Sequence, residues 1–240
     1  LQNIPIRTET GRKIRAAFVA GAEFEALLTA DYSQIEMRIM AHLTEDEALI
    51  EAFKSGEDLH TTVGSEVFGV APAEVTAEMR RKVKAMSYGL AYGLGAYGLS
   101  QQLGITPAEA SALMERYFER FGAVQRYLKD VVVEATRNGY TETMFGRRRY
   151  LPELSNPPIQ GSAADIIKIA MLKVEQDFIA AGLRSRLVLQ VHDELVVELA
   201  AGEREQVETI VRSGMGGAAD LKVPLEVSVG VGPNWDAAAH

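Results

Sequence analysis

Acidic residues interrupt a stretch of the chain that is otherwise apolar. Residues 187–199 read LVLQVHDELVVEL, with Asp193 and Glu194 near the centre. A buried carboxylate without compensation is costly, so such a group usually has a partner, changes its pKa or binds a metal ion. Another acid, Asp31, follows the apolar part of EFEALLTADYS at residues 23–33.

Asp31 and Asp193 are each predicted at the end of a β-strand. Strand ends of one sheet can meet even when they are distant in sequence. Two carboxylates that converge without a basic neighbour suit a hard cation with oxygen ligands, Mg²⁺ or Mn²⁺. Taken singly, Asp31 could cap the following helix and Asp193 could be an ordinary turn residue. If the two carboxylates lie close together in the folded chain, a metal site is favoured over a helix cap at Asp31 and a turn residue at Asp193.

A further group of candidates lies on the helix predicted at 76–93. Arg80, Lys84 and Tyr88 are spaced by four residues. Because an α-helix turns about 100° per residue, these three share one face, with Tyr92 at its edge. Two cations followed by an aromatic ring can hold a phosphate chain and stack a base or sugar. The alternative is a solvated helix with an amphipathic tyrosine, and only the acids elsewhere in the chain favour the first interpretation.

Three other polar residues stand in segments that could contribute to a site: His60 in DLHTTV, Gln160 in PIQGSAAD, and His192. A lone His is most often a structural residue, and Gln160, close to a predicted helix start, could be a local cap. Taken singly, these residues carry little functional information.

Composition bounds the class of protein. The chain has 240 residues, of which 47% are hydrophobic, a net charge of −8 and no Cys. This length suits one large or two small globular domains. The absence of Cys excludes disulfides, thiolate metal sites and a Cys nucleophile, and no apolar run is long enough to span a bilayer. The negative charge alone argues against a nucleic-acid partner. Basic residues are nevertheless clustered at Arg12, Lys13 and Arg15, at Arg80, Arg81, Lys82 and Lys84, and at Arg147, Arg148 and Arg149.

Hydrophobic periodicity and turn residues predict a mainly helical chain with a few strands. The predicted strands are 23–33, 140–145, two within 187–199 and 224–232; the predicted helices are 35–43, 59–69, 76–93, one or two within 106–139, 158–182 and 203–215. Strands and helices do not alternate as βαβ units, so we expect an α+β fold. GLGAYG at 93–98 matches a dinucleotide fingerprint but follows a predicted helix instead of a strand, and we reject it.

Three segments together resemble a known family. DYSQIEMR (31–38), RRKVKAMSYGLAYG (80–93) and QVHDE (190–194) closely resemble, in this order, motifs A, B and C of the family A DNA polymerases, the bacterial DNA polymerase I group. Four more segments are also similar to that family: LQNIPIR (1–7), GRRRYLPEL (146–154), PIQGSAAD (158–165) and GPNWDAAAH at the C-terminus. The resemblance covers almost the whole chain.

The resemblance implies a right-hand polymerase fold of the α+β class, with an antiparallel palm sheet, mainly helical fingers and the thumb missing. The palm would comprise residues 1–45 with motif A and 140–240 with the motif C hairpin at 187–199. The fingers would comprise 46–139, with the motif B helix at 76–93. The chain would be a monomer without a membrane anchor, associated with the nucleoid in the bacterial cytoplasm and acting in DNA replication and repair.

The resemblance also implies the reaction. A deoxynucleotide would pass from a dNTP to a primer 3′-hydroxyl on primer–template DNA, with release of pyrophosphate, by a mechanism that uses two Mg²⁺ ions or Mn²⁺. Asp31, Asp193 and the backbone of Tyr32 would bind the ions. Glu194 would be a supporting carboxylate, and Lys84 would give a proton to the leaving group.

The other implied site residues fall into two groups. Those that would bind the incoming nucleotide are Arg80, Lys84, Tyr88, His60, Gln34 and Glu36, and those that would contact DNA are Tyr92, Gln160, His192 and Arg7. Glu36, packed against Tyr88, matches the family's ribose gate, which leaves no room for a 2′-hydroxyl. The helix at 76–93 would be the moving part of the fingers.

The sequence departs from the family pattern at two places. It begins at Leu1, whereas family members have a thumb upstream of this point and some also have nuclease domains. In SNPPIQG, Asn156 is followed directly by Pro157, whereas the family has a longer segment there. We therefore expect the chain to be part of a longer protein.

Several functions are alternatives to that of a bacterial DNA polymerase I. They are a phage-type or translesion relative, a non-catalytic DNA-binding fragment, and a metal-dependent nuclease. A nuclease would not account for the stripe of Arg80, Lys84 and Tyr88.

Tyr88 generates a prediction about chain terminators. Many family members carry Phe at the matching position, and those with Tyr use dideoxynucleotides readily because the phenol replaces a hydrogen bond lost with the 3′-hydroxyl. We expect efficient dideoxynucleotide use, and its loss in Tyr88→Phe. Single-nucleotide incorporation kinetics with a dNTP and the matching terminator measure this ratio. Equal terminator use by both proteins would contradict the assigned role of Tyr88.

Overall fold

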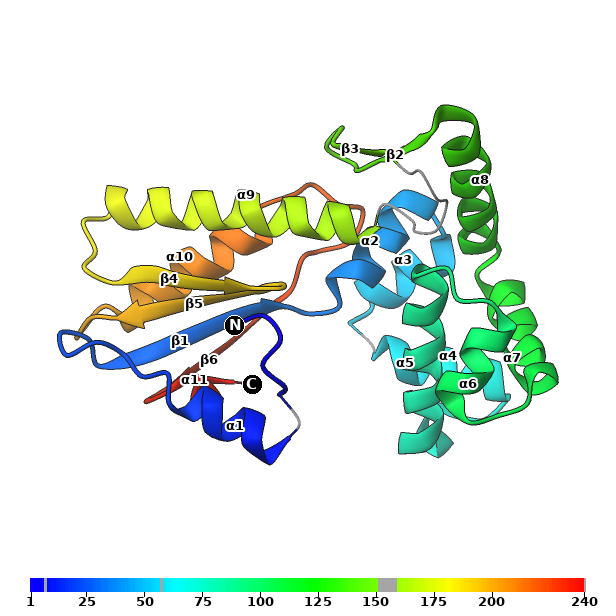
Figure 1. Ribbon diagram of the computed structural model, residues 1–240, viewed down its shortest axis with the longest axis horizontal. Coiled ribbons are helices and arrows are strands. Elements are labelled where there is room, and N and C mark those ends of the chain that lie inside the picture. The colour runs from blue at the N-terminus through cyan, green and yellow to red at the C-terminus, as the bar shows by residue number, and fades with distance from the viewer. Residues whose placement is uncertain (7, 57, 151–158, 240) are drawn as a thin grey trace. The chain divides into compact units, whose positions relative to one another are not determined.

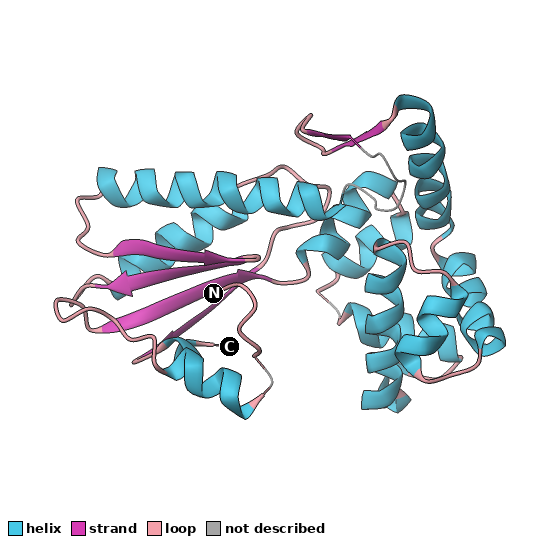
Figure 2. Cartoon of the chain, viewed as in Figure 1, coloured by secondary structure: helices cyan, strands magenta, loops and turns pink. Residues whose placement is uncertain are grey.

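The computed structural model describes residues 1–6, 8–56, 58–150 and 159–239. The chain forms two compact units. Unit 1 comprises Leu1–Ile35, Ala163–Asp220 and Leu225–His240, and unit 2 comprises Glu36–Ser162 and Leu221–Pro224. Helices and antiparallel strands occur together (Figure 2), which confirms the predicted α+β class.

Unit 1 contains a four-stranded antiparallel sheet with the strand order β4-β5-β1-β6 (Figure 1). Its strands are β1 (Ala26–Tyr32), β4 (Arg186–Val191), β5 (Glu194–Leu199) and β6 (Val227–Gly232). β1 is a central strand because it pairs with β5 on one side and β6 on the other. The strands predicted at 23–33, at 224–232 and within 187–199 are therefore confirmed.

Helices cover both faces of this sheet (Figure 1). They are α9 (Ile159–Ala180) and α10 (Arg204–Gly216) on one face and α1 (Glu9–Ala16) and α11 (Trp235–Ala238) on the other. The Tyr32 hydroxyl donates to the carbonyl of Met215 in α10 at 2.8 Å, and the Thr29 hydroxyl donates to the carbonyl of Ala238 in α11 at 2.6 Å. Since side chains alternate along a strand, these two contacts lie on opposite faces of the sheet.

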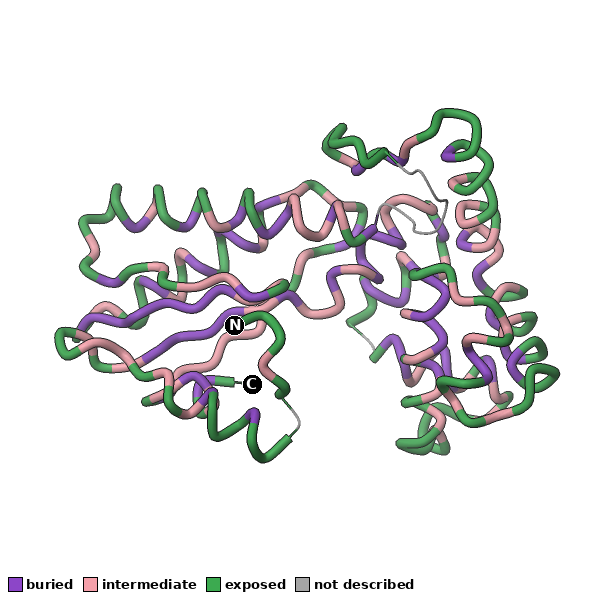
Figure 3. Tube along the Cα trace, viewed as in Figure 1, coloured by how far each residue is buried: buried purple, intermediate pink, exposed green. Residues whose placement is uncertain are grey.

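Burial on both faces explains why β1 reads as a continuous apolar run instead of an alternating one. Leu27 and Leu28 point to opposite faces, yet both are buried, and most of β1 is drawn as buried in Figure 3. Gly232 ends β6 beneath α11. A Cβ at Gly232 would lie 2.5 Å from the backbone carbon of Ala237, so only glycine permits this close approach of α11.

A two-residue turn joins β4 to β5. Val191 pairs with Glu194, so His192 and Asp193 form the turn, as the sequence predicted. His192 has a φ of 53°, in the left-handed region that His adopts more readily than most residues other than glycine. The side-chain amide of Gln190 donates to the His192 carbonyl at 2.6 Å. This hydrogen bond helps to fix the turn that carries Asp193.

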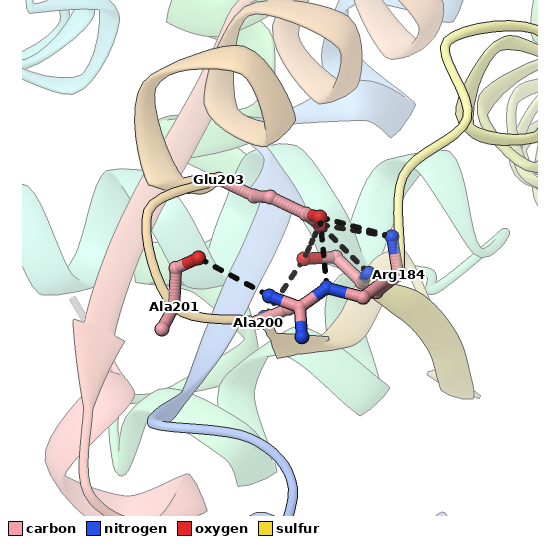
Figure 4. Close-up of polar contacts among 5 residues, drawn as sticks. Arg184, Ala200, Ala201 and Glu203 are labelled. Atoms are coloured by element: carbon pink, nitrogen blue, oxygen red, sulfur yellow. Dashed lines mark hydrogen bonds and ion pairs between the residues drawn. The ribbon is translucent and has the colours of Figure 1, made fainter.

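The Glu203 carboxylate links two loops of unit 1 through hydrogen bonds (Figure 4). Its carboxylate accepts the backbone N–H of Arg184 at 3.1 Å, and both the backbone N–H and the hydroxyl of Ser185 at 2.8 Å. The Ser185 hydroxyl also accepts the backbone N–H of Ala200 at 2.9 Å. Partial burial raises the pKa of Glu203, but these hydrogen bonds outweigh it and hold the pKa below its ordinary value. The ionised carboxylate thus joins the chain before β4 to the chain after β5.

Unit 2 is mainly helical. Its elements are α2 (Ile35–Thr44), α3 (Glu47–Lys54), α4 (Leu59–Phe68), the 3₁₀ turn η1 (Pro72–Glu74), α5 (Ala77–Ala91), α6 (Ala96–Leu103), α7 (Pro107–Arg120), α8 (Gly122–Asn138) and the hairpin of β2 (Tyr140–Glu142) with β3 (Arg148–Tyr150). Thr106 and Glu109 form a capping box at the start of α7, and Gly139 ends α8 with a φ of 74°. The helical stretch predicted at 106–139 is two helices, which meet at Phe121.

Some elements were not predicted. Helices α1, α3 and α6 have eight residues each, which leaves little periodicity to detect. The strand predicted at 140–145 is only β2, and the run of arginines after it supplies its partner β3. GLGAYG follows α5 and runs into the first residues of α6, so the prediction that it follows a helix instead of a strand is confirmed. None of the helices in the described ranges is long and apolar enough to cross a membrane.

Replacing Glu203 should reveal how much its carboxylate stabilises unit 1. Glu203→Ala removes the acceptor for two backbone N–H groups, and we expect the free energy of unfolding to fall by about 1–3 kcal/mol. Glu175→Ala, which changes an exposed glutamate on α9, is the matched control and should stay within about 0.5 kcal/mol of the parent. Urea denaturation followed by circular dichroism measures both. Equal stability of the two variants would contradict this role.

Candidate active site

The structure brings Asp31 and Asp193 together at one end of the sheet of unit 1. Asp31 is the penultimate residue of β1 and pairs in register with Glu194, the residue after Asp193. The backbone N–H of Tyr32 donates to the backbone carbonyl of Asp193 at 3.4 Å. The sequence therefore predicted correctly that two distant strand ends meet here, and Asp193 is also the turn residue of the alternative interpretation.

The two aspartates affect each other electrostatically. Burial raises the pKa of Asp193, the negative charge of Asp31 raises it further, and a backbone hydrogen bond and His192 oppose the shift. Both side chains are half-buried. The raised pKa means that ionising Asp193 beside Asp31 is unfavourable without a compensating positive charge, and such sites are common where a protein performs chemistry.

This donor set fits a hard divalent cation. Within the described ranges no three His, Asp or Glu side chains are grouped closely enough to enclose a metal by themselves. Mg²⁺, however, is commonly bound by one or two carboxylates, with water and substrate phosphates as the remaining ligands. Asp31 and Asp193 supply two carboxylates, and the backbone of Tyr32 lies beside them. The Tyr32 side chain has a separate, structural role because it is buried against α10.

Glu194 is engaged elsewhere. Its Oε1 accepts a hydrogen bond from the indole N–H of Trp235 at 2.6 Å and lies 3.6 Å from the guanidinium of Arg15. Neither partner was predicted. Trp235 stands in the C-terminal segment GPNWDAAAH, which resembles the family, but no sequence pattern links it to Glu194 across 41 positions.

His192 and Gln34 are the other predicted site residues of unit 1. The exposed His192 ring donates from Nε2 to the carbonyl of Gln2 at 2.8 Å. Gln34 follows β1 with a φ of 55°, and its buried side-chain oxygen has no hydrogen-bond partner among the described residues. An unsatisfied buried acceptor is uncommon, and a bound water, ion or ligand is one explanation for it. Arg7, predicted to contact DNA, lies outside the described residues.

Within unit 2, helix α5 presents the predicted stripe. The ammonium of Lys84 lies 5.9 Å from the centroid of the Tyr88 ring, so these side chains share one face as the spacing predicted. The His60 ring, from α4, lies 6.2 Å from the Tyr88 ring. Arg80 forms an ion pair of 2.7 Å with Asp58. Asp58 was not predicted, although it stands two residues before His60.

His60 is neutral at physiological pH. It is 6% exposed, and neither ring nitrogen has a hydrogen-bond partner among the described residues. Burial lowers the pKa of His60 from 6.5 to about 4; Asp58 opposes this shift, and Lys84 and Arg80 add to it. The ring therefore offers an uncharged, unsatisfied polar group beside the cations of α5.

Tyr92, Glu36 and Gln160 form a second cluster in unit 2. The Tyr92 hydroxyl donates to the Glu36 carboxylate, with oxygen distances of 2.5 and 2.6 Å, and Gln160 also hydrogen-bonds this hydroxyl. Burial and the neighbouring Glu36 raise the pKa of Tyr92. Glu36 was expected against Tyr88, and its contact with Tyr92 was not foreseen. The cluster brings together three of the predicted nucleotide-binding and DNA-binding residues.

The fold and these sites together define a class of protein. Paired aspartates at strand ends suit a divalent cation. A helix with Arg, Lys and Tyr on one face, next to a neutral His, suits a phosphate-bearing substrate. These features are typical of metal-dependent enzymes that act on nucleotides.

The sequence profile of DNA polymerase family A matches residues 1–237, and the chain belongs to this family. DNA polymerase I of Mycobacterium bovis is 62% identical over 255 residues, which cover 100% of this chain and 28% of that protein. DNA polymerase I of Bacillus subtilis is 49% identical over 250 residues, covering 98% of this chain and 28% of that protein. The chain thus spans less than a third of these curated relatives.

A solved structure is similar over the whole chain. It is described as the POL domain of Pol1 from M. smegmatis in complex with DNA primer-template and dNTP, and it superposes with a TM-score of 0.95 at 62% identity. The match covers 100% of this chain and 45% of that one. The mixed helical and antiparallel architecture is therefore that of a polymerase domain. Family A polymerases generally use a divalent metal ion.

The lowered pKa of His60 predicts a pH dependence of stability. The folded protein binds a proton at His60 only near pH 4, whereas the unfolded chain binds it near 6.5. The stabilisation is therefore complete above pH 6.5 and is lost as the pH falls toward 4. Relative to His60→Gln, we expect the parent to lose about 1–3 kcal/mol of unfolding free energy over this interval. Urea denaturation at a series of pH values measures it, and parallel curves would contradict the assignment.

Proposed function

We propose that this chain carries the nucleotidyl-transfer site of a template-directed DNA polymerase that acts in DNA replication and repair. The enzyme adds a deoxynucleotide from a dNTP to the 3′-hydroxyl of a primer and releases pyrophosphate. The observation that carries the proposal is the meeting of Asp31 and Asp193 at the end of one sheet. Family membership and the substrates of the solved relative support it.

Asp31, Asp193 and the backbone of Tyr32 would hold two Mg²⁺ ions, for which Mn²⁺ can substitute. When bound, the ions activate the primer 3′-hydroxyl and stabilise the leaving pyrophosphate. The chain contributes the fixed spacing of the carboxylates. The register of β1 with β5 sets the position of Asp31, and the turn between β4 and β5 sets that of Asp193.

Residues of α5 and its neighbours would bind the incoming nucleotide. Arg80 and Lys84 contact the triphosphate, and Lys84 gives a proton to the leaving pyrophosphate. Tyr88 stacks on the sugar and base. His60 suits a phosphate oxygen because its ring is unsatisfied and can donate one hydrogen bond without carrying charge. Gln34 also contacts the nucleotide, and its unsatisfied side-chain oxygen supports a ligand there.

The cluster of Tyr92, Glu36 and Gln160 would test the nucleotide and its template base. Glu36 limits the space for a 2′-hydroxyl, and its hydrogen bonds to Tyr92 hold the carboxylate in place. Gln160, His192 and Arg7 contact the primer–template. Sequence selection comes from base pairing, while the protein contacts shape and phosphates.

The polymerase names for the parts of the chain follow from this assignment. Residues 1–45 and 140–240 form the palm and residues 46–139 the fingers, whose helix α5 closes on a correct nucleotide. The protein acts as a monomer, bound to primer–template DNA and not to membranes. The bacterial origin of the relatives supports a location in the cytoplasm, at the nucleoid.

Primer extension tests the proposal. We expect the full-length gene product to extend a primer in the presence of Mg²⁺, and Asp31→Asn and Asp193→Asn each to lower the rate by roughly 1,000-fold or more, because each removes a ligand charge at the reacting centre. Asp130→Asn, on the exposed surface of α8, is the matched control and should retain the parent rate. Gel analysis of extended primers, together with an assay for released pyrophosphate, measures both steps.

The two readouts distinguish the alternatives. Shortening of the DNA without pyrophosphate release would indicate a nuclease. DNA binding without extension by the parent would indicate a non-catalytic binding module. Extension that survives in both aspartate variants would refute the site assigned here.

A further inference from the structure

A buried arginine lies beside the acidic end of the sheet. The side chain of Arg15, in the last turn of α1, is 4% exposed, and its guanidinium lies 3.6 Å from Oε1 of Glu194. Burying a cation without an anion is strongly unfavourable, so an arginine in this position needs a carboxylate partner. Glu194 is that partner within the described part of the chain.

Trp235 holds the same carboxylate from a second direction. Its indole N–H donates to Oε1 of Glu194 at 2.6 Å, and the Arg15 guanidinium stacks over the Trp235 ring at 3.8 Å from the centroid. The ring is 1% exposed, and Phe18 packs edge-on against it at 5.4 Å and 84°. Arg15, Trp235 and Glu194 therefore form one packed unit on the α11 face of the sheet.

Glu194 stands next to both aspartates of the proposed metal site. It follows Asp193 directly and lies opposite Asp31 in the register of β1 with β5. Side chains that are directly opposite each other in an antiparallel pair share a face, with Cβ atoms about 4.5–5.5 Å apart. A free Glu194 would therefore add a third negative charge, and a third ligand, beside Asp31 and Asp193.

We propose that Arg15, with Trp235, withholds Glu194 from the cation site and neutralises its charge, so that Asp31 and Asp193 alone set the affinity for the divalent ion. This inference rests on the proposed function and changes the role expected for Glu194. Arg15 is a positioning residue that acts through Glu194. Its part is to keep the site from binding the cation too tightly or in a different geometry.

The charges predict effects of opposite sign. Arg15→Met leaves Glu194 uncompensated beside the site, so Mn²⁺ should bind about 3- to 10-fold more tightly than to the parent. Glu194→Gln leaves the Arg15 charge uncompensated, and Mn²⁺ should bind about 3- to 10-fold more weakly. The double variant restores neutrality and should return to within about twofold of the parent. A merely structural role would weaken binding in both single variants.

Direct titration with Mn²⁺, followed by electron paramagnetic resonance of the free ion, measures these affinities in the 240-residue chain. Asp31→Asn identifies the relevant site, because its binding should be lost in that variant. Circular dichroism establishes that each protein is folded. If Arg15→Met does not fold, Arg15→Gln also removes the charge and should bind Mn²⁺ about 3- to 10-fold more tightly than the parent; binding equal to or weaker than that of the parent would overturn the proposal.

A second measurement needs no variant. Trp235 is the only tryptophan of this chain, so emission excited at 295 nm reports on the partner of Glu194. Saturating Mg²⁺ should leave the Trp235 emission unchanged, since Glu194 keeps its hydrogen bond while the ion binds Asp31 and Asp193. If Glu194 is itself a metal ligand, Mg²⁺ draws it away and the emission shifts.

The outcomes separate this inference from the proposed function. Mn²⁺ binding that depends on Asp31, together with a Mg²⁺-induced shift of Trp235 emission in the parent, would overturn the role of Arg15 and leave the polymerase site intact. Weakened binding in both single variants would also overturn it. Failure of the parent to bind Mn²⁺ at Asp31 would overturn both proposals.

Discussion

The pairing of β1 within the sheet of unit 1 is the constraint that holds two carboxylates, Asp31 and Asp193, close together at one end of that sheet. Burial and the negative charge of Asp31 raise the pKa of Asp193, so the two side chains would separate if the backbone were free to move. The fold prevents this. β1 is held between β5 and β6, and burial on both faces fixes its register, since a slip by one residue would turn its side chains to the wrong face.

Compensation of charge divides the acids of this region into two kinds. Glu194 has a buried cation and an indole donor within the protein, so its charge is balanced in the folded state. Burial and the neighbouring Asp31 raise the pKa of Asp193, so its ionised form is less favourable than that of an ordinary aspartate. Neighbouring carboxylates on one strand end thus differ in how their charges are balanced, according to what packs behind them.

The sequence alone predicted the features that depend on local pattern. The strand ends at Asp31 and Asp193, the helix carrying Arg80 to Tyr88, and the glycine that ends α8 all follow from periodicity and turn residues that act over a few positions. The resemblance to a family added roles for single residues. Two contacts could not be predicted, because they join residues far apart in sequence whose types are common: Arg15 with Glu194, and Tyr92 with Glu36. Short helices such as α6 were missed because eight residues give a weak periodic signal.

The left-handed backbone of His192 limits how this protein can vary in evolution. A β-branched or bulky residue at position 192 would pay a steric cost at φ 53°, whereas Gly, Asn or Asp could replace His192 with little strain. Drift at this position is thus confined to a few residue types by backbone geometry, whatever chemistry the imidazole performs. Invariance of a histidine at this turn among descendants would therefore require a second pressure besides the backbone geometry of the hairpin.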